Sequence, residues 1–208
     1  MKTVLAILTF AVIFLPSTSA SAHHEWERWP TTNGNLRLEV GSNLDARWQP
    51  HLEQAVADWS TTAHGNPVRL TIVPGAGNPD CGFVTGRIEV CNWNLGKSFG
   101  MSGFTDVQVD ENGMVTAMRV VLNDAEFPIE ENSPINIEDR QLMMCHELGH
   151  ALGLAHVDET GASFGTCMDY SGDKWYPNQH DFEQLVRAYG RYRPWSWYSV
   201  RVGQVTAR

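Results

Sequence analysis

The chain has 208 residues, of which 42% are hydrophobic and 19% are charged, so it can form one globular domain with a packed core. This composition argues against intrinsic disorder and against collagen-like repeats. Aspartate and glutamate outnumber lysine and arginine by 24 to 15, which gives a formal net charge of -9. Nucleic-acid phosphates need basic patches, so we expect no nucleic-acid partner.

The first 22 residues have the pattern of a secretory signal peptide. Lys2 gives the positive start, residues 4–15 are apolar apart from Thr9, and residues 20–22 have the small-x-small form of a cleavage site. The apolar stretch is too short to span a bilayer, and its flanks favour a signal peptide over a buried core helix. We therefore expect a secreted chain, free of the membrane after cleavage, whose residues 23–208 form one domain.

The first two-thirds of this domain predict a sheet with one helix packed on it. Five segments have the apolar alternation or the β-branched content of strands: 36–40, 68–73, 87–93, 104–110 and 114–122. The last two flank an Asn-Gly pair, which favours a hairpin. Residues 47–61 predict the helix, because four apolar side chains recur on one helical face: Leu52, Ala55, Val56 and Trp59.

The rest of the chain predicts two helices separated by a loop. Residues 137–152 have a helical pattern with Asn136 as the expected N-cap and Gly153 as the end. The last helix covers residues 179–189, with Asn178 as its N-cap. A run of strands followed by helices is typical of an α+β fold, and no linker long enough for a second domain separates these elements.

The four cysteines suit an exported protein in an oxidising compartment. Three pairings are possible, and the order of the cysteines in the chain cannot choose among them. Cys81 and Cys91 flank a stretch with two glycines at turn-like positions, which suits a disulfide across a hairpin. That pairing would leave Cys145 with Cys167, whereas the alternative is four buried free thiols.

A histidine motif at the end of the long predicted helix carries the chemistry. His146 and His150 are four residues apart and lie on one helical face, so both imidazoles can reach one ion at about 2.0 to 2.1 Å. Gly153 can turn the chain in a left-handed conformation so that His156 becomes a third ligand. Three neutral histidines leave a fourth zinc position open, as in catalytic sites, with Glu147 placed as general base. Histidines held by hydrogen bonds in a core helix are the alternative.

Residues 146–156 resemble the metzincin superfamily of zinc metallopeptidases, because they match its signature H-E-x-x-H-x-x-G-x-x-H at every fixed position. The resemblance implies a zinc endopeptidase of α+β fold. Its expected parts are a twisted mixed sheet, an active-site helix and a second helix packed on that sheet, and a cleft. An N-terminal subdomain would extend to about residue 153, and a small C-terminal subdomain with the final helix would cover residues 154–208.

The resemblance also implies roles for residues around the metal. Met168 is the candidate for the methionine that packs beneath the zinc in metzincins. Tyr170 resembles the tyrosine that reaches toward the zinc or the oxyanion in the astacin and serralysin branches, whereas the short chain and the closing helix resemble a matrixin-type domain. Because the ligand helix and the methionine turn touch in metzincins, the resemblance implies a disulfide between Cys145 and Cys167 beneath the site.

The partner of a metzincin is a protein or peptide substrate, which would add as a strand to an exposed sheet edge. The resemblance implies that this edge is the strand before the active-site helix, residues 114–122. Zinc is the expected cofactor, and loops 75–80 and 123–132 offer oxygen ligands for calcium, although solvated surface loops are the alternative. We expect a monomer. Two other functions fit the motif: a non-catalytic secreted zinc-binding module on the same fold, and an amidase acting on non-peptide amides.

Overall fold

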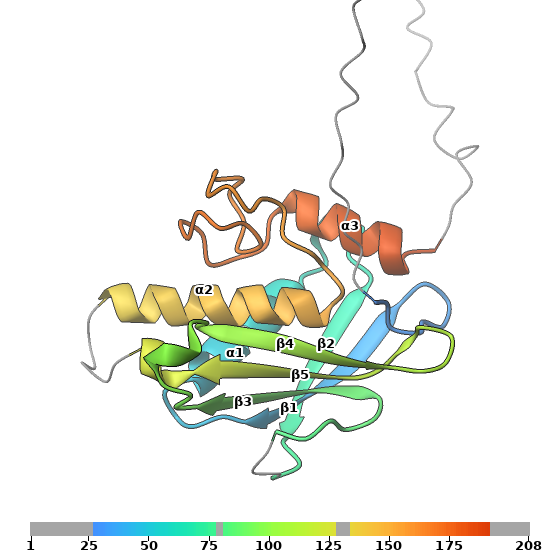
Figure 1. Ribbon diagram of the computed structural model, residues 1–208. Coiled ribbons are helices and arrows are strands. Elements are labelled where there is room, and N and C mark those ends of the chain that lie inside the picture. Colours follow the sequence, from blue (N-terminus) through green and yellow to red (C-terminus); the bar gives the residue numbers. More distant parts are fainter. Residues whose placement is uncertain (1–26, 78–80, 128–133, 192–208) are drawn as a thin grey trace, which may run out of the picture.

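The computed structural model describes residues 27–77, 81–127 and 134–191, which contain one β-sheet and three α-helices (Figure 1). The strands are β1 (Leu36–Asn43), β2 (Val68–Pro74), β3 (Arg87–Trp93), β4 (Gly103–Val109) and β5 (Val115–Asn123). The helices are α1 (Gln49–Trp59), α2 (Pro134–Ala151) and α3 (Gln179–Tyr189). The predicted α+β class is confirmed, whereas the predicted signal peptide lies outside the described residues. None of the described helices has the length and apolarity needed to cross a membrane.

The sheet has the strand order β2-β1-β3-β5-β4, in which β4 runs antiparallel to β5 and the other neighbours are parallel. The Asn-Gly hairpin joins β4 to β5, as predicted. The prediction that residues 114–122 form the exposed edge is wrong, because β5 pairs with β3 on one side and with β4 on the other. After leaving β3, the chain passes to the edge as β4 and returns inside it as β5, so β4 is the edge strand beside α2.

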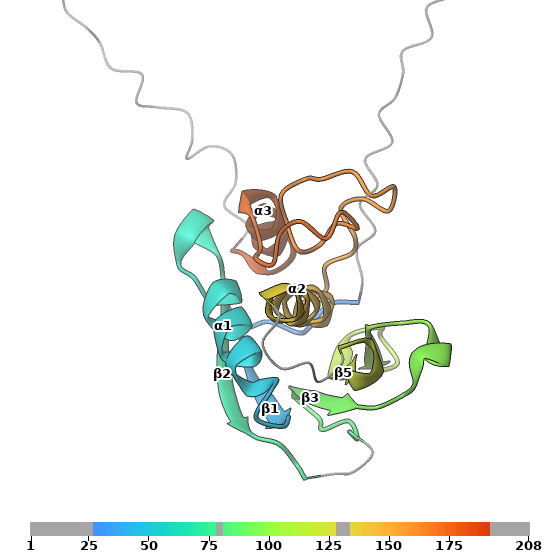
Figure 2. The same cartoon turned by 90° about the vertical axis from the view of Figure 1, so that its left-hand side faces the viewer.

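Helices α1 and α2 cover one face of the sheet, and α3 lies beyond α2 (Figure 2). The predicted apolar face of α1 is buried there, with Leu52 and Trp59 fully enclosed. These side chains belong to one core with Ile88 and Val90 of the sheet and Leu148 of α2. Helix α2 is therefore a middle layer, held by the sheet on one side and by the C-terminal segment on the other (Figure 2).

On the opposite face of the sheet, Cys81 of the loop before β3 packs against the strands. Cys91 and Val121 point to this face, since they alternate with core residues along β3 and β5. A disulfide with Cys81, with a Cα–Cα distance of 6.0 Å, holds this loop against them. This pairing confirms the prediction from the sequence, although Cys81 lies in a loop and not on a hairpin strand.

Helix α2 starts three residues earlier than predicted and ends at Ala151, one residue before the predicted end. It begins at Pro134, so Asn136 lies inside the helix and the prediction that it is the N-cap is wrong. Proline is favourable at the first helical position, where its missing N–H would have no partner. At the other end, Gly153 has φ of 84°, and its N–H bonds to the carbonyl of His150 (2.8 Å) while the next N–H bonds to that of Gly149 (3.1 Å). This Schellman ending turns the chain back toward the helix.

Helix α3 begins at its predicted N-cap. The Asn178 side chain accepts hydrogen bonds from the N–H groups of His180 (2.8 Å) and Asp181 (3.3 Å). The Asp181 carboxylate accepts the Asn178 N–H in return (2.8 Å), which completes a capping box. The capping box thus fixes the residue at which α3 begins.

Candidate metal centre and active site

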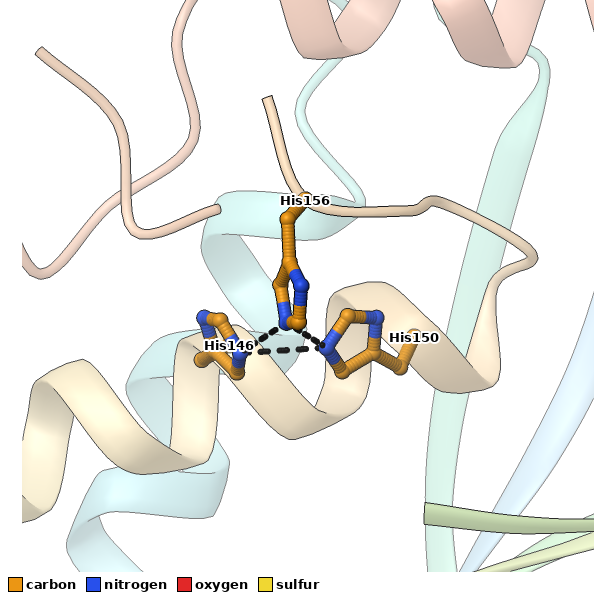
Figure 3. A group of neighbouring side chains, drawn as sticks. All are labelled: His146, His150 and His156. Carbon is orange, nitrogen blue, oxygen red and sulfur yellow. Dashed lines mark hydrogen bonds between the residues drawn. The ribbon is translucent and has the colours of Figure 1, made fainter. Parts of the chain in front are cut away.

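Three histidines from α2 and the loop after it converge on one point (Figure 3). His146 and His150 lie one turn apart on α2. The chain turns at Gly153 after the helix, and His156 lies over the other two histidines (Figure 3). The Nε2 atoms of His146 and His150 are 3.0 Å apart, and that of His156 lies 3.0 Å from His150 and 3.2 Å from His146. The structure thus brings together the three residues that the sequence predicts as zinc ligands.

The other ring nitrogen, Nδ1, faces a backbone carbonyl in two of these histidines. Nδ1 of His146 lies 2.7 Å from the Cys167 carbonyl oxygen, and Nδ1 of His150 lies 2.7 Å from that of Leu154. A carbonyl can only accept, so both Nδ1 atoms carry the proton and a neutral ring then has its lone pair on Nε2. Burial lowers the pKa of His146 to about 4 and that of His150 to about 3, so both rings are neutral near pH 7.

The third histidine has a carboxylate as its partner. Nδ1 of His156 lies 3.1 Å from Oε1 of Glu159, whose side chain is 71% exposed. An ionised carboxylate also only accepts, so it selects the same tautomer as the two carbonyls. All three Nε2 lone pairs therefore face one another, and Glu159 is a site residue that the sequence analysis does not identify.

This donor set fits a zinc ion. Three lone pairs that meet at 3.0 to 3.2 Å repel one another unless a cation lies among them. Tetrahedral zinc with bonds of about 2.0 to 2.1 Å needs about 3.3 to 3.4 Å between its ligand nitrogens, close to the distances present. Histidines that bind zinc are usually oriented by a hydrogen bond from the other ring nitrogen, which each of these three has.

The expected calcium site receives no support. Within the described ranges, the three histidines are the one group of three or more His, Cys, Asp or Glu side chains that could hold a metal ion. Of the two loops that suggested calcium, residues 78–80 and 128–132 lie outside the described residues.

Met168 is buried against α2. Its side chain is fully buried, and its carbonyl accepts the N–H of Val157, just after the third histidine (2.9 Å). A Cβ added to Gly149 on α2 would overlap Met168 Sδ and would lie 2.8 Å from the Trp59 ring. Gly149 therefore leaves the space in which the methionine packs against the helix. Nothing in the residue pattern assigns a role to Gly149, apart from its small size within the motif.

A disulfide between Cys145 and Cys167 ties the segment that contains Met168 to α2, with a Cα–Cα distance of 6.0 Å. Both cysteines are fully buried. They directly precede His146 and Met168, so the bond joins the ligand helix to the segment whose carbonyl orients His146. The pairing that the metzincin resemblance implies is confirmed.

Glu147 belongs to α2, and its side chain faces β4. It is 5% exposed, and burial raises its pKa to about 7. Its Oε2 accepts a hydrogen bond from the hydroxyl of Thr105 on β4 (2.8 Å). A carboxyl group with a pKa near neutrality can accept a proton and release it again, which is what a general base and acid must do.

Tyr170 flanks the histidines on the solvent side. Its ring centroid lies 4.4 Å from that of His156 and 6.4 Å from that of His146, and the residue is 52% exposed. Its backbone N–H bonds to the carbonyl of Asp158 (3.2 Å), so the loop after His156 helps to hold it. The structure therefore places the predicted oxyanion donor beside the predicted ligands.

The sequence matches no protein-family model, and a search of curated proteins finds no match. Among solved structures, the chain is similar to a structure of myroilysin, with 18% identity and a TM-score of 0.38 over 62% of this chain and 52% of that chain. It is also similar to high choriolytic enzyme 1, a hatching enzyme zinc-protease from the medaka fish Oryzias latipes, with 14% identity and a TM-score of 0.34 over 66% and 52%. A crystal structure of myroilysin matches with 16% identity and a TM-score of 0.36 over 84% and 68%.

The matched region spans about half the length of the first two of these structures. Because the scores and identities are low, a functional proposal has to rest on the histidine site itself.

Proposed function

We propose that this protein is a secreted zinc-dependent endopeptidase of the metzincin type. The observation that carries the proposal is the convergence of three imidazoles through Nε2 next to a buried carboxyl group of raised pKa. The complete signature at residues 146–156 supports it. The signal-like start of the sequence and the two disulfides support export.

His146, His150 and His156 would hold the zinc through Nε2. When bound, zinc supplies a Lewis acid that polarises the scissile carbonyl and makes the attacking water more acidic. Glu147 accepts a proton from this water while the water oxygen bonds to the carbonyl carbon. Glu147 then gives the proton to the leaving amine nitrogen as the C–N bond breaks. The Tyr170 hydroxyl donates a hydrogen bond to the carbonyl oxygen as that atom gains negative charge.

A protein or peptide substrate would add to the outer edge of β4, which pairs with no other strand among the described residues. Strand β4 borders α2 and carries Thr105, which contacts the general base, Glu147. Main-chain hydrogen bonds to an edge strand recognise an extended peptide whatever its side chains, so they suit an enzyme that cuts within a chain. This edge replaces the one that the sequence analysis expects, since β5 has no free edge.

The proposal is tested by incubating the purified, zinc-loaded protein with casein or gelatin, with and without a chelator. We expect cleavage that the chelator stops. Glu147→Ala should lower turnover by about 10²- to 10⁴-fold, because it removes the general base, and should retain about one zinc per chain. His150→Ala should lose the zinc in elemental analysis.

The same assay separates the other two functions. Zinc bound by the wild type without any proteolysis would contradict the proposal and favour a non-catalytic zinc-binding module. Release of an amine from a non-peptide amide, again without proteolysis, would favour an amidase. Absence of zinc binding would contradict all three.

A further inference from the structure

Strand β4 presents two residues to the carboxyl group of Glu147. Side chains alternate along a strand, and Phe104 packs with the cluster on the far face of the sheet. Its neighbours Gly103 and Thr105 therefore face α2, where Gly103 is buried and Thr105 is half-buried.

Gly103 leaves room for one side of the carboxyl group. A Cβ at this position would lie 3.1 Å from Glu147 Cγ and 3.2 Å from Oε1, closer than ordinary van der Waals contact. A larger residue at this position would press on the side chain of Glu147. The absence of a side chain at Gly103 thus allows Glu147 to lie against the strand.

Thr105 holds the other side. Its hydroxyl oxygen lies 2.8 Å from Oε2 of Glu147 and 2.9 Å from the main-chain oxygen of the same residue. A hydroxyl has one hydrogen, so it donates to one of these two acceptors at a time. An ionised carboxylate is the stronger acceptor, because hydrogen bonds to charged groups are shorter and stronger than neutral ones.

We propose that Thr105 is a positioning residue, whose hydroxyl fixes the carboxyl group of Glu147 for proton transfer during peptide hydrolysis. The inference rests on the proposed function. It predicts an effect on the chemical step, because Thr105 acts through Glu147 and not on the substrate.

The test compares three variants of the zinc-loaded protein with the wild type on one peptide substrate. Thr105→Val removes the hydroxyl and keeps the shape, and should lower kcat by about 10- to 100-fold with KM unchanged within about twofold, as expected for loss of a hydrogen bond to a charged group. Thr105→Ser keeps the hydroxyl and should retain most of kcat. Thr116→Val is the matched control. The hydroxyl of Thr116 on β5 donates to the main-chain oxygen of Gln108 on β4 (3.1 Å), away from the base.

Zinc content and the thermal midpoint, Tm, are measured for every variant. A merely structural role would lower Tm and leave kcat of the folded fraction unchanged, and serine would then not differ from valine in kcat. If valine disturbs folding, Thr105→Ala removes the same hydroxyl with less bulk and gives the comparison.

Two results would overturn the inference alone: a kcat for Thr105→Val within about twofold of an active wild type, or a loss in Thr105→Ser as large as that in Thr105→Val. A wild type that binds zinc but hydrolyses no peptide would overturn the proposed function and the inference together.

Discussion

The two disulfides close loops of similar length and differ in what surrounds them in the fold. Cys81 and Cys91 are 10 residues apart, Cys145 and Cys167 are 22 apart, and the Cα–Cα distance is 6.0 Å in both. Loop-closure entropy depends on the logarithm of this separation, so it predicts that each bond stabilises the fold by about 3 kcal/mol. The first holds a loop on the far face of the sheet, whereas the second holds the carbonyl that orients His146. Equal cross-links can therefore have unequal consequences for a site.

The largest expected effect comes from removing each disulfide in turn. The double variants Cys145→Ala with Cys167→Ala, and Cys81→Ala with Cys91→Ala, should each lose about 3 kcal/mol of unfolding free energy in urea titrations. The first alone should also bind zinc about 10- to 100-fold more weakly, because it frees the partner of a ligand histidine. Zinc titration against a competing chelator measures this difference.

Equal zinc affinity in the two double variants would contradict the comparison. It would mean that packing of Met168 and the helix is enough to hold the Cys167 carbonyl in place without the covalent bond.

A smaller effect is expected from two glycine substitutions that repeat the comparison without touching a disulfide. In Gly149→Ala the new methyl group would overlap Met168 Sδ next to α2, and in Gly41→Ala it would overlap the carboxylate of Glu89 on the far face. Overpacking costs about 1 to 3 kcal/mol, so thermal unfolding should show both variants to be less stable. Zinc affinity should fall in Gly149→Ala alone, and a fall of the same size in Gly41→Ala would show that general loosening weakens the site.

Within the site, Glu159 should have a modest effect. Glu159→Gln keeps an oxygen near Nδ1 of His156 but removes the charge, and the position is largely exposed, so zinc affinity should fall by about tenfold or less. Glu183→Gln, an exposed change on α3, is the control and should leave zinc affinity unchanged. A loss of 100-fold or more in Glu159→Gln would show that the carboxylate does more than orient the ring.

The pH dependence of stability should show the smallest effect, at Asp181. Burial raises the pKa of Asp181 above its usual 3.8. The folded state therefore binds this proton more tightly than the unfolded chain, so the resulting stability is complete below pH 3.8 and is lost as the pH rises through the raised pKa. In metal-free protein, the unfolding free energy of the wild type minus that of Asp181→Asn should decrease as the pH rises.

Urea unfolding at several pH values measures this difference. A constant difference would show that Asp181 does not titrate differently in the folded and unfolded states. Its hydrogen bonds to the Thr166 hydroxyl and the Asn178 N–H would then account for its whole contribution.

Features that depend on neighbouring residues were predictable from the sequence. The two histidines one turn apart, the Asn178 cap and the Asn-Gly hairpin each need only a short stretch of chain, and the structure has all three. The start of α2 was missed because the residue type of Asn136 suits a cap, while Pro134 suits the first helical position just as well.

Features that depend on the path of the chain were not predictable. No local pattern shows that β4 occupies the edge, because this follows from the order in which the strands cross the sheet. For the same reason nothing marks Thr105 as a partner of Glu147, 42 residues away, or Gly149 as the space for Met168. These contacts appear only once the sheet, the helix and the loop are packed together.

The position of Cys145 next to His146 bears on how the protein matures. Before oxidation, the chain carries a thiol one residue before His146 and another one residue before Met168, and a thiolate is itself a strong zinc ligand. A reduced chain therefore offers an incoming ion rival donors, and closing the disulfide removes them. We therefore expect a three-histidine centre to form most readily when oxidation comes before metal binding, which is the order that an oxidising compartment favours.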